Sequence, residues 1–188
     1  MTVQPYVMEK IRASFDFIDA DGDHVITEDD HILQGKRVAA ALGHPEGSAE
    51  ERRIIDAYLR IWKELHLPMD TDGDGKVDMD EFIAATSKLS EDPAMAERLI
   101  GNLTDSFFAI ADRDGDGGID PAEYAAFMAG HAPGMPSAEV AEAFRHLDID
   151  GDGQITREEL HRANVEYFTS NDPTVPGSWA FGRPTAAA

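Results

Sequence analysis

The segment that decides the fold is Asp70-Thr71-Asp72-Gly73-Asp74-Gly75-Lys76-Val77-Asp78-Met79-Asp80-Glu81. Acidic residues occupy every second position at its start, so several carboxylate oxygens approach one point when the chain curls. Carboxylates packed this closely repel one another unless a cation lies between them. A twelve-residue loop around such a cation takes ligands from positions 1, 3, 5, 7, 9 and 12, with a sharp left-handed turn at position 6. The segment fits this pattern throughout, which indicates a calcium site.

The same pattern of ligands recurs along the chain. In the segment above, the predicted ligands are the side chains of Asp70, Asp72, Asp74, Asp78 and Glu81 and the carbonyl oxygen of Lys76, with Gly75 at the turn. Residues 112–123 offer Asp112, Asp114, Asp116, Asp120, Glu123 and the carbonyl of Gly118, around Gly117. Residues 148–159 offer Asp148, Asp150, Asp152, Thr156, Glu159 and the carbonyl of Gln154, around Gly153. These three segments, which we call loops two, three and four, are complete calcium loops.

Loop one, residues 19–30, departs from the pattern twice. Its predicted ligands are Asp19, Asp21, Asp23, the carbonyl of Val25, Thr27 and Asp30. His24 stands where glycine normally makes the sharp turn, and a positive φ costs most residues about 1 kcal/mol or more, histidine somewhat less. Asp30 is one methylene shorter than the usual glutamate. Six oxygens would suit magnesium, whereas a shift of the following helix would keep calcium, and the sequence leaves both open.

Position 8 of each loop carries an apolar residue that favours strands. These residues are Ile26, Val77, Ile119 and Ile155. They predict a short two-strand contact between paired loops. Apolar residues at helical spacing flank each loop, so we expect all the remaining regular structure to be α-helix. Ser48 with Glu51, Asp92-Pro93 and Asp120-Pro121 predict helix starts, and Gly43 predicts a stop.

Four such loops between apolar helices resemble the EF-hand family, whose unit is a helix, a calcium loop and a second helix. The interval from His31 to Met69 is much longer than that from Tyr124 to Leu147, and the chain continues past loop four. With the altered loop one, these features resemble the sarcoplasmic calcium-binding proteins and calerythrin. The resemblance implies an all-α fold with two pairs of EF-hand units, at residues 1–90 and 91–168, and a C-terminal extension at 169–188. Members of that family often carry aspartate at position 12 and still bind metal, which favours a functional loop one.

The composition limits the classes of partner. A formal net charge of −21 opposes binding to nucleic acid and to anionic lipid, and no basic run compensates it. The absence of cysteine excludes disulfides and thiolate metal sites. No run of about 18 apolar residues could span a bilayer, and the N-terminal residues lack the pattern of a secretion signal. We expect a monomeric cytoplasmic protein.

Three functions fit these loops. The first is a calcium buffer or store, with magnesium exchange at loop one. The second is a sensor that grips a partner helix when calcium binds, although the methionines do not cluster as they do in a sensor groove. The third is a small-molecule binder, because calcium-regulated photoproteins and coelenterazine-binding proteins resemble this layout. No catalytic motif stands out, so we do not expect an enzyme.

The C-terminal extension bears on this choice. It holds Trp179 and Phe181, large apolar groups that a disordered tail would rarely carry. In the resembling family the extension packs against the EF-hand body, which implies that both rings fill a cavity that a sensor leaves for its target. For a small-molecule site, the candidate lining residues are Phe15, Trp62, Phe108, Phe144 and Trp179.

Overall fold

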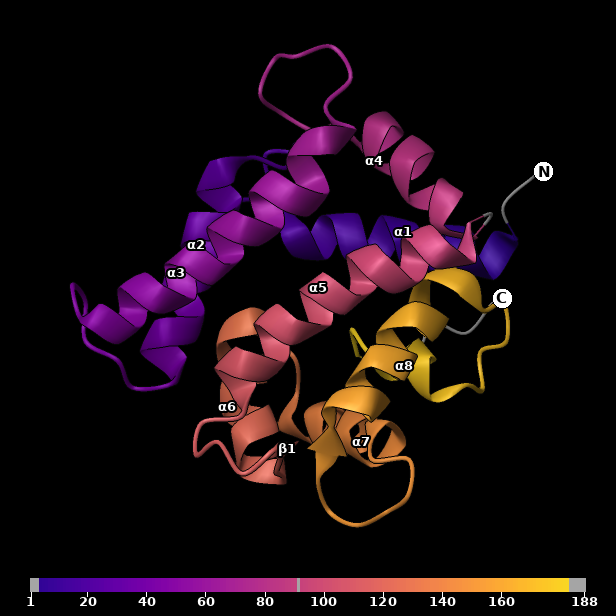
Figure 1. The fold of residues 1–188 in the computed structure, drawn as a ribbon. Helices are drawn as coiled ribbons and strands as arrows, with labels where there is room; N and C mark the ends of the chain where they lie inside the picture. Colours follow the sequence, from indigo (N-terminus) through magenta and orange to yellow (C-terminus); the bar gives the residue numbers. More distant parts are fainter. Residues whose placement is uncertain (1–3, 91, 183–188) are drawn as a thin grey trace.

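The computed structural model describes residues 4–90 and 92–182. Within them the chain forms α1 (Pro5–Ile18), α2 (Glu28–Ala41), α3 (Ala49–Ile61), η1, a π-helix (Trp62–His66), η2 (Leu67–Met69), α4 (Met79–Thr86), η3 (Ser87–Ser90), α5 (Pro93–Ala111), β1 (Gly118–Ile119), α6 (Pro121–His131), α7 (Ser137–Leu147), β2 (Ile155–Thr156), α8 (Arg157–Thr169) and η4 (Pro176–Trp179). Figure 1 shows α5 running along the junction between the N-terminal half, in indigo to magenta, and the C-terminal half, in orange to yellow. The predicted all-α class with small strand contacts is confirmed.

The loops pair through their position-8 residues. The backbone N–H groups of Ile26 and Val77 each donate to the other's carbonyl at 2.9 Å, which joins loop one to loop two. Strands β1 and β2 pair antiparallel, with Ile119 opposite Ile155, and join loop three to loop four. All four side chains are at most 2% exposed. The predicted contacts are confirmed, and they fix which loops are neighbours.

Helix ends follow the polar residues that the sequence provides. The Ser48 hydroxyl accepts a hydrogen bond from the N–H of Glu51 at 3.0 Å and begins α3. Asp92 and Asp120 cap α5 and α6 in the same way, each followed by proline. Gly43 has φ +83° just after α2, a conformation that glycine adopts at little cost. The predicted boundaries are confirmed at these positions.

Two hydrophobic cores cross the junction between the halves. One, the α2/α6 core, joins Val38 and Tyr58 to Phe127 and Phe144. The other, the α1/α8 core, packs Phe15 and Phe82 of the N-terminal half with residues of α5 and α8. Both cores therefore draw on both halves. The division of the chain near residue 90 stays a prediction about units of sequence.

Helices α2 and α6 cross at a glycine. A Cβ at Gly130 would lie 2.5 Å from Cα of Val38 and 2.7 Å from the carbonyl oxygen of Arg37, distances that real Cβ atoms do not reach. The backbones therefore touch here without a side chain between them. Gly130 permits the close crossing on which the α2/α6 core depends.

The chain after α8 is anchored to the body by polar contacts. The N–H of Gly177 donates to the Glu166 carboxylate at 3.0 Å, and the Lys10 ammonium of α1 donates to the carbonyl of Ser170 at 2.7 Å. Lys10 is only 4% exposed, and burial lowers the pKa of its ammonium to about 8, although the Glu166 charge acts in the opposite direction. These contacts join the extension to the first helix, α1, and to the last α-helix, α8.

The two aromatic residues of the extension occupy different places. The Phe181 ring enters the interior, with centroids 5.1 Å from Phe17 and 4.6 Å from Tyr167. Trp179 is half-buried and stacks on His146 at 4.2 Å. Both rings dock, but the expectation that both fill the cavity is wrong for Trp179, because η4 turns that ring towards α7. Residues 183–188 of the predicted extension lie outside the described part of the chain.

Within residues 4–90 and 92–182, no helix combines the length and the apolar character that crossing a membrane requires.

Replacing Gly130 by alanine tests the close crossing of α2 and α6. The new methyl group must push the two backbones apart, so we expect the free energy of unfolding in urea to fall by about 2 kcal/mol or more. Gly101 of α5 is the matched control, because a Cβ there meets only a His161 carbon at 3.6 Å. Alanine at Gly101 should raise stability by up to about 1 kcal/mol. Equal effects of the two variants would contradict the crossing.

Candidate metal centres

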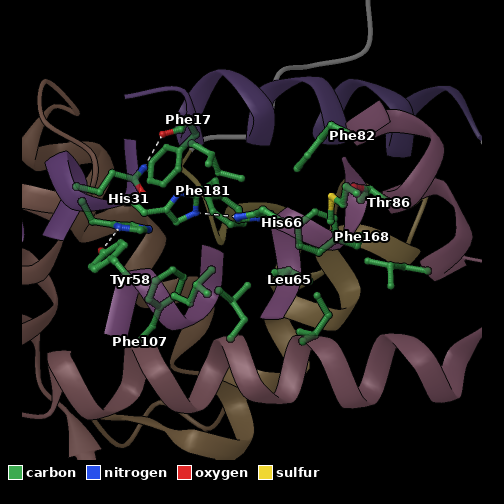
Figure 2. A pocket seen from close by; sticks show the side chains of 18 residues that line it. Phe17, His31, Tyr58, Leu65, His66, Phe82, Thr86, Phe107, Phe168 and Phe181 are labelled. Carbon is green, nitrogen blue, oxygen red and sulfur yellow. Dashed lines mark hydrogen bonds between the residues drawn. The ribbon is translucent and has the colours of Figure 1, made fainter. Parts of the chain in front are cut away.

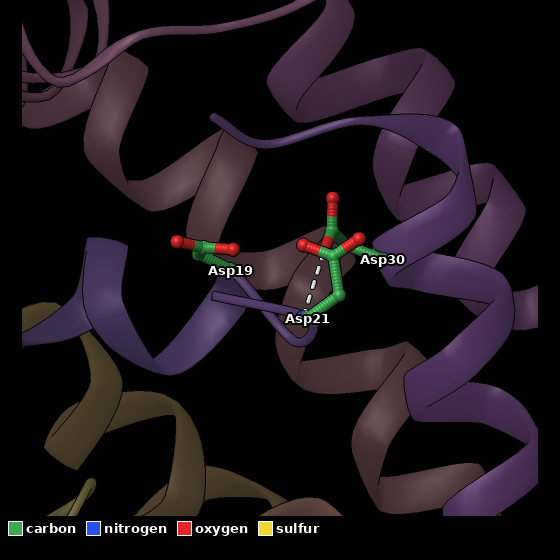
Figure 3. Close-up of side chains that lie close together, drawn as sticks. All are labelled: Asp19, Asp21 and Asp30. Atoms are coloured by element: carbon green, nitrogen blue, oxygen red, sulfur yellow. Dashed lines mark hydrogen bonds between the residues drawn. The ribbon is translucent and has the colours of Figure 1, made fainter. Parts of the chain in front are cut away.

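Each of the four loops brings three carboxylates together. The clusters are Asp19, Asp21 and Asp30; Asp70, Asp72 and Glu81; Asp112, Asp114 and Glu123; and Asp148, Asp150 and Glu159. In each cluster the oxygens that could bind an ion lie within 4.8 Å of one another. These residues hold positions 1, 3 and 12, and Figure 3 shows the three of loop one. The first and last predicted ligands of each loop are therefore neighbours in space.

Backbone amides hold the first carboxylate of each loop in place. In loop two, Asp70 accepts hydrogen bonds from the N–H groups of Gly73 at 2.7 Å and Gly75 at 2.9 Å. The bonds from Gly75 and Gly73 lower the pKa of the Asp70 carboxyl. The backbone N–H groups of the loop therefore surround the ionised carboxylate of Asp70 and hold the loop in its curled form.

The carboxylate at position 12 closes the loop from the other end. Glu81 accepts from the hydroxyl and the N–H of Thr71, both at 2.7 Å, and from the N–H of Asp78 at 3.2 Å. These bonds, that from the Thr71 hydroxyl first, lower the pKa of Glu81. The first residues of the loop and of the following helix are thus joined through one charged group.

The other predicted ligands lie beside these clusters. At position 5, Asp74 accepts from the N–H of Lys76 at 2.8 Å, and at position 9, Asp78 caps the following helix by accepting from the N–H of Glu81 at 2.9 Å. The predicted carboxylate ligands that do not belong to the clusters are Asp23, Asp74, Asp116 and Asp152 at position 5 and Asp78 and Asp120 at position 9. The remaining predicted ligands are not carboxylates. They are the hydroxyls of Thr27 and Thr156 at position 9 and the carbonyls of Val25, Lys76, Gly118 and Gln154 at position 7. Their role as ligands stays a prediction.

The donor set fits a hard divalent cation. Each cluster offers carboxylate oxygens alone, and the histidines stand elsewhere. Calcium binds six to eight oxygens at 2.3–2.6 Å, so ligand oxygens on either side of an ion lie up to about 5 Å apart. The clusters meet this spacing.

Position 6 confirms the turn that the sequence predicts. Gly75, Gly117 and Gly153 have φ of +84°, +95° and +94°. His24 of loop one has φ +71° and is the one residue other than glycine with positive φ among those the structure describes. Its side chain is exposed, so it contributes no packing that would offset the backbone strain.

Loop one is the most deeply buried of the four. Asp19 is 9% exposed and Asp30 only 2%. Asp30 accepts from the N–H of Ala20 at 2.9 Å and from both the N–H and the hydroxyl of Thr27 at 2.8 Å. The short side chain thus reaches both ends of the loop, because the loop closes tightly around it.

A cavity of about 40 Å³ lies between the helices, and Figure 2 shows its wall. Its lining includes Phe17, Tyr58, Phe82, Phe107, Phe168 and Phe181. None of the five aromatic residues expected from the sequence lines it. Phe15 and Trp62 lie in the α1/α8 core, Phe108 and Phe144 pack in the α2/α6 core, and Trp179 stacks on His146. Helical spacing predicted buried rings, but it does not tell which side of a core faces a void.

Three buried histidines on the cavity wall were not anticipated. His31 and His66 share a hydrogen bond of 2.8 Å, and burial lowers the pKa of both. His131 bonds to the Tyr58 hydroxyl at 2.6 Å, while its Nε2 has no partner among the described residues. A histidine spaced like the apolar residues of an amphipathic helix is the only signal that the sequence offers for them.

Comparisons with known proteins agree with this geometry. A family model described as an EF-hand domain pair matches residues 102–163, and one described as an EF hand matches residues 69–84. Calerythrin of Saccharopolyspora erythraea is 29% identical over 154 residues, which cover 81% of this chain and 86% of calerythrin. Obelin of Obelia longissima is 30% identical over 189 residues, 96% of this chain and 92% of obelin.

Solved structures share the fold. The coelenterazine-binding protein of Renilla muelleri superposes with a TM-score of 0.75 over 94% of both chains at 20% identity. The sarcoplasmic calcium-binding protein of amphioxus gives a TM-score of 0.70 over 98% of this chain and 100% of the other, at 18% identity. At these identities the likeness concerns the fold.

The buried histidines predict how stability depends on pH. Burial lowers the pKa of His131 to about 3, whereas histidine in an unfolded chain titrates near 6.5. The unfolded chain therefore binds a proton that the folded chain does not, and the free energy of unfolding falls as pH drops below about 6.5.

We expect His131 to account for a loss of about 1.4 kcal/mol between pH 7.5 and 5.5 in the metal-free protein. Urea unfolding of His131→Leu at the two pH values should show the total loss reduced by that amount. An unchanged loss would contradict a neutral His131 in the folded state.

Proposed function

This chain belongs to the EF-hand family of calcium-binding proteins, and the function that we propose for it starts from that premise. The chain binds calcium, and we infer that it acts as a monomeric cytoplasmic buffer or store. All four loops take part, with the six ligands that the sequence assigns to each. The observation that carries this proposal is the set of four carboxylate clusters whose oxygens lie within 4.8 Å of one another.

Loops two, three and four hold calcium, and loop one exchanges magnesium with calcium. Asp30 has a short side chain, is 2% exposed and is fixed by hydrogen bonds from both ends of its loop. A rigid, tight set of six oxygens suits the smaller magnesium ion, whereas calcium prefers a larger and more flexible set. Loop one thus differs from the others in ion preference.

A buffer rather than a sensor accounts for the surface and the extension. A sensor exposes a large apolar groove when calcium binds. Here Phe181 lies in the interior where a partner's side chain would have to enter, and only Leu67 and Ile149 are large apolar residues exposed among those described. The chain therefore fills with its own Phe181 a place where a partner helix would insert a side chain. No catalysed reaction is proposed.

A small-molecule binder is the second candidate. One observation favours it: the Nε2 of His131 is buried beside an apolar cavity and lacks a partner within residues 4–90 and 92–182. A ligand with one polar atom would satisfy this group. The similar Renilla protein is a coelenterazine-binding protein by name. A cavity of about 40 Å³ holds little more than one or two waters, so a ligand of that class would have to displace Phe181.

Calcium titration calorimetry tests the buffer proposal. We expect four binding events without magnesium, and with millimolar magnesium a weakened event at loop one only. Each filled site should add to the free energy of unfolding, by about 2.7 kcal/mol at a hundredfold excess over its Kd. Equal stability with chelator and with calcium would contradict calcium binding as the function.

Phe181→Ala separates the remaining candidates. A buffer should bind calcium with the same stoichiometry in this variant, and the intact chain should not bind a hydrophobic dye at any calcium concentration. Calcium-dependent dye binding by the intact chain would favour the sensor instead. Saturable binding of coelenterazine by the intact chain, seen by its absorbance and strengthened in Phe181→Ala, would favour the small-molecule binder.

A further inference from the structure

Two histidines connect loop one to the segment that enters loop two. His31 directly follows Asp30, and His66 ends the π-helix η1 just before Asp70. We propose that the hydrogen bond between His31 and His66 positions Asp30 for the cation of loop one and couples that loop to loop two. This inference rests on the proposed function, because it takes loop one to bind a cation.

The direction of the hydrogen bonds is fixed by chemistry. Nδ1 of His31 lies 2.8 Å from the carbonyl oxygen of Thr27, which can only accept, so Nδ1 carries the proton. In a neutral ring the other nitrogen, Nε2, is then an acceptor. Nδ1 of His66, 2.8 Å away, must therefore donate to it. The three groups form a one-way chain from His66 through His31 to Thr27, and Figure 2 shows its central bond.

This chain ends on the residue that holds Asp30. Thr27 gives its N–H and its hydroxyl to the Asp30 carboxylate, and its carbonyl accepts from His31. All the polar groups of Thr27 are thus engaged. The short Asp30 has no spare methylene with which to adjust its reach, so the position of Thr27 and of the first turn of α2 decides where its oxygens lie.

Both histidine rings are buried beside other aromatic rings. His31 is 1% exposed and His66 is 4% exposed. The rings next to them are those of Trp62, 5.4 Å from His31, and Phe82, 6.1 Å from His66. If the bond between the histidines broke, both nitrogens would stay buried among apolar groups. Breaking the bond would therefore cost free energy, and this cost opposes a movement of one loop away from the other.

The histidine contact differs from the other link between these loops. Ile26 and Val77 join the loops through backbone atoms at position 8, which no change at His66 removes. His66 instead makes its contact by its side chain. It is the last residue of the five-residue π-helix η1, and its ring bonds to His31 of α2. Side-chain variants can therefore test the histidine bond while the backbone pairing stays intact.

Two variants of His66 match each other in shape. Asparagine places its amide nitrogen near the position of the histidine Nδ1 and can donate, whereas leucine has the same branched shape and cannot. His131→Leu is the control for loss of a buried histidine on the same cavity wall, since His131 bonds to Tyr58, which lies outside both loops. All variants are made in the full chain.

The measurement is the affinity of loop one for magnesium and for calcium, followed by nuclear magnetic resonance through the amides of Ala20 and Thr27. We expect His66→Leu to weaken cation binding at loop one about fivefold to tenfold, the loss that one hydrogen bond supports. His66→Asn should restore most of it, and His131→Leu should change it less than twofold. The ratio of magnesium to calcium affinity should change in His66→Leu alone.

The coupling is tested with Glu81→Gln, which weakens loop two. This change should lower the affinity of loop one in the native background and have a smaller effect in His66→Leu. Equal effects in both backgrounds would overturn the coupling. Equal affinities in His66→Leu and the native chain, or the same loss in His131→Leu, would overturn the positioning role.

Failure of the proposed function gives a different result. If loop one of the native chain binds neither cation at millimolar concentration, the proposed function fails there, and the inference fails with it. The bond itself is checked in the metal-free native chain by nitrogen-15 shifts of the imidazoles. They should show His31 protonated at Nδ1 and accepting at Nε2. The opposite tautomer would overturn the inference even if His66→Leu does not fold.

Discussion

Repulsion among carboxylates is the constraint on which this structure depends. The chain has a formal charge of −21, and each of its four loops holds a cluster of three acidic residues. In each cluster the carboxylate oxygens that could bind an ion lie within 4.8 Å of one another. Backbone amides and threonine hydroxyls compensate part of that charge, as at Asp70 and Glu81. The negative charge that these hydrogen bonds do not compensate favours the binding of a cation. The loops are therefore shaped for an ion before one binds, and folding and ion binding are linked.

The rest of the chain holds the loops in this strained arrangement. The paired position-8 residues set two loops side by side, and the helices on either side bury their apolar faces in two shared cores. Gly130 lets the halves meet, and the extension adds Phe181 to the interior. Both cores cross the junction, so the two pairs of loops rest on shared packing.

The ligand pattern could be predicted from the sequence because its spacing is local. Twelve consecutive residues decide where Asp70 and Glu81 meet, and Ile119 and Ile155 pair by their place in the loops. The contact between His31 and His66 could not be predicted, because it depends on how α2 lies against η1. The same holds for the cavity, since helical spacing shows that a ring is buried and not which neighbours it meets. Trp179 was misplaced for this reason.

Native mass spectrometry of the intact chain at increasing calcium tests the central claim most directly. If the four clusters are metal centres, the spectrum should reach four bound calcium ions per monomer, with the fourth ion sensitive to competing magnesium. Replacing Glu123 and Glu159 together by glutamine should leave loops one and two as the remaining strong sites. Two or fewer ions at saturation in the native chain would contradict the claim that all four loops are built around a cation.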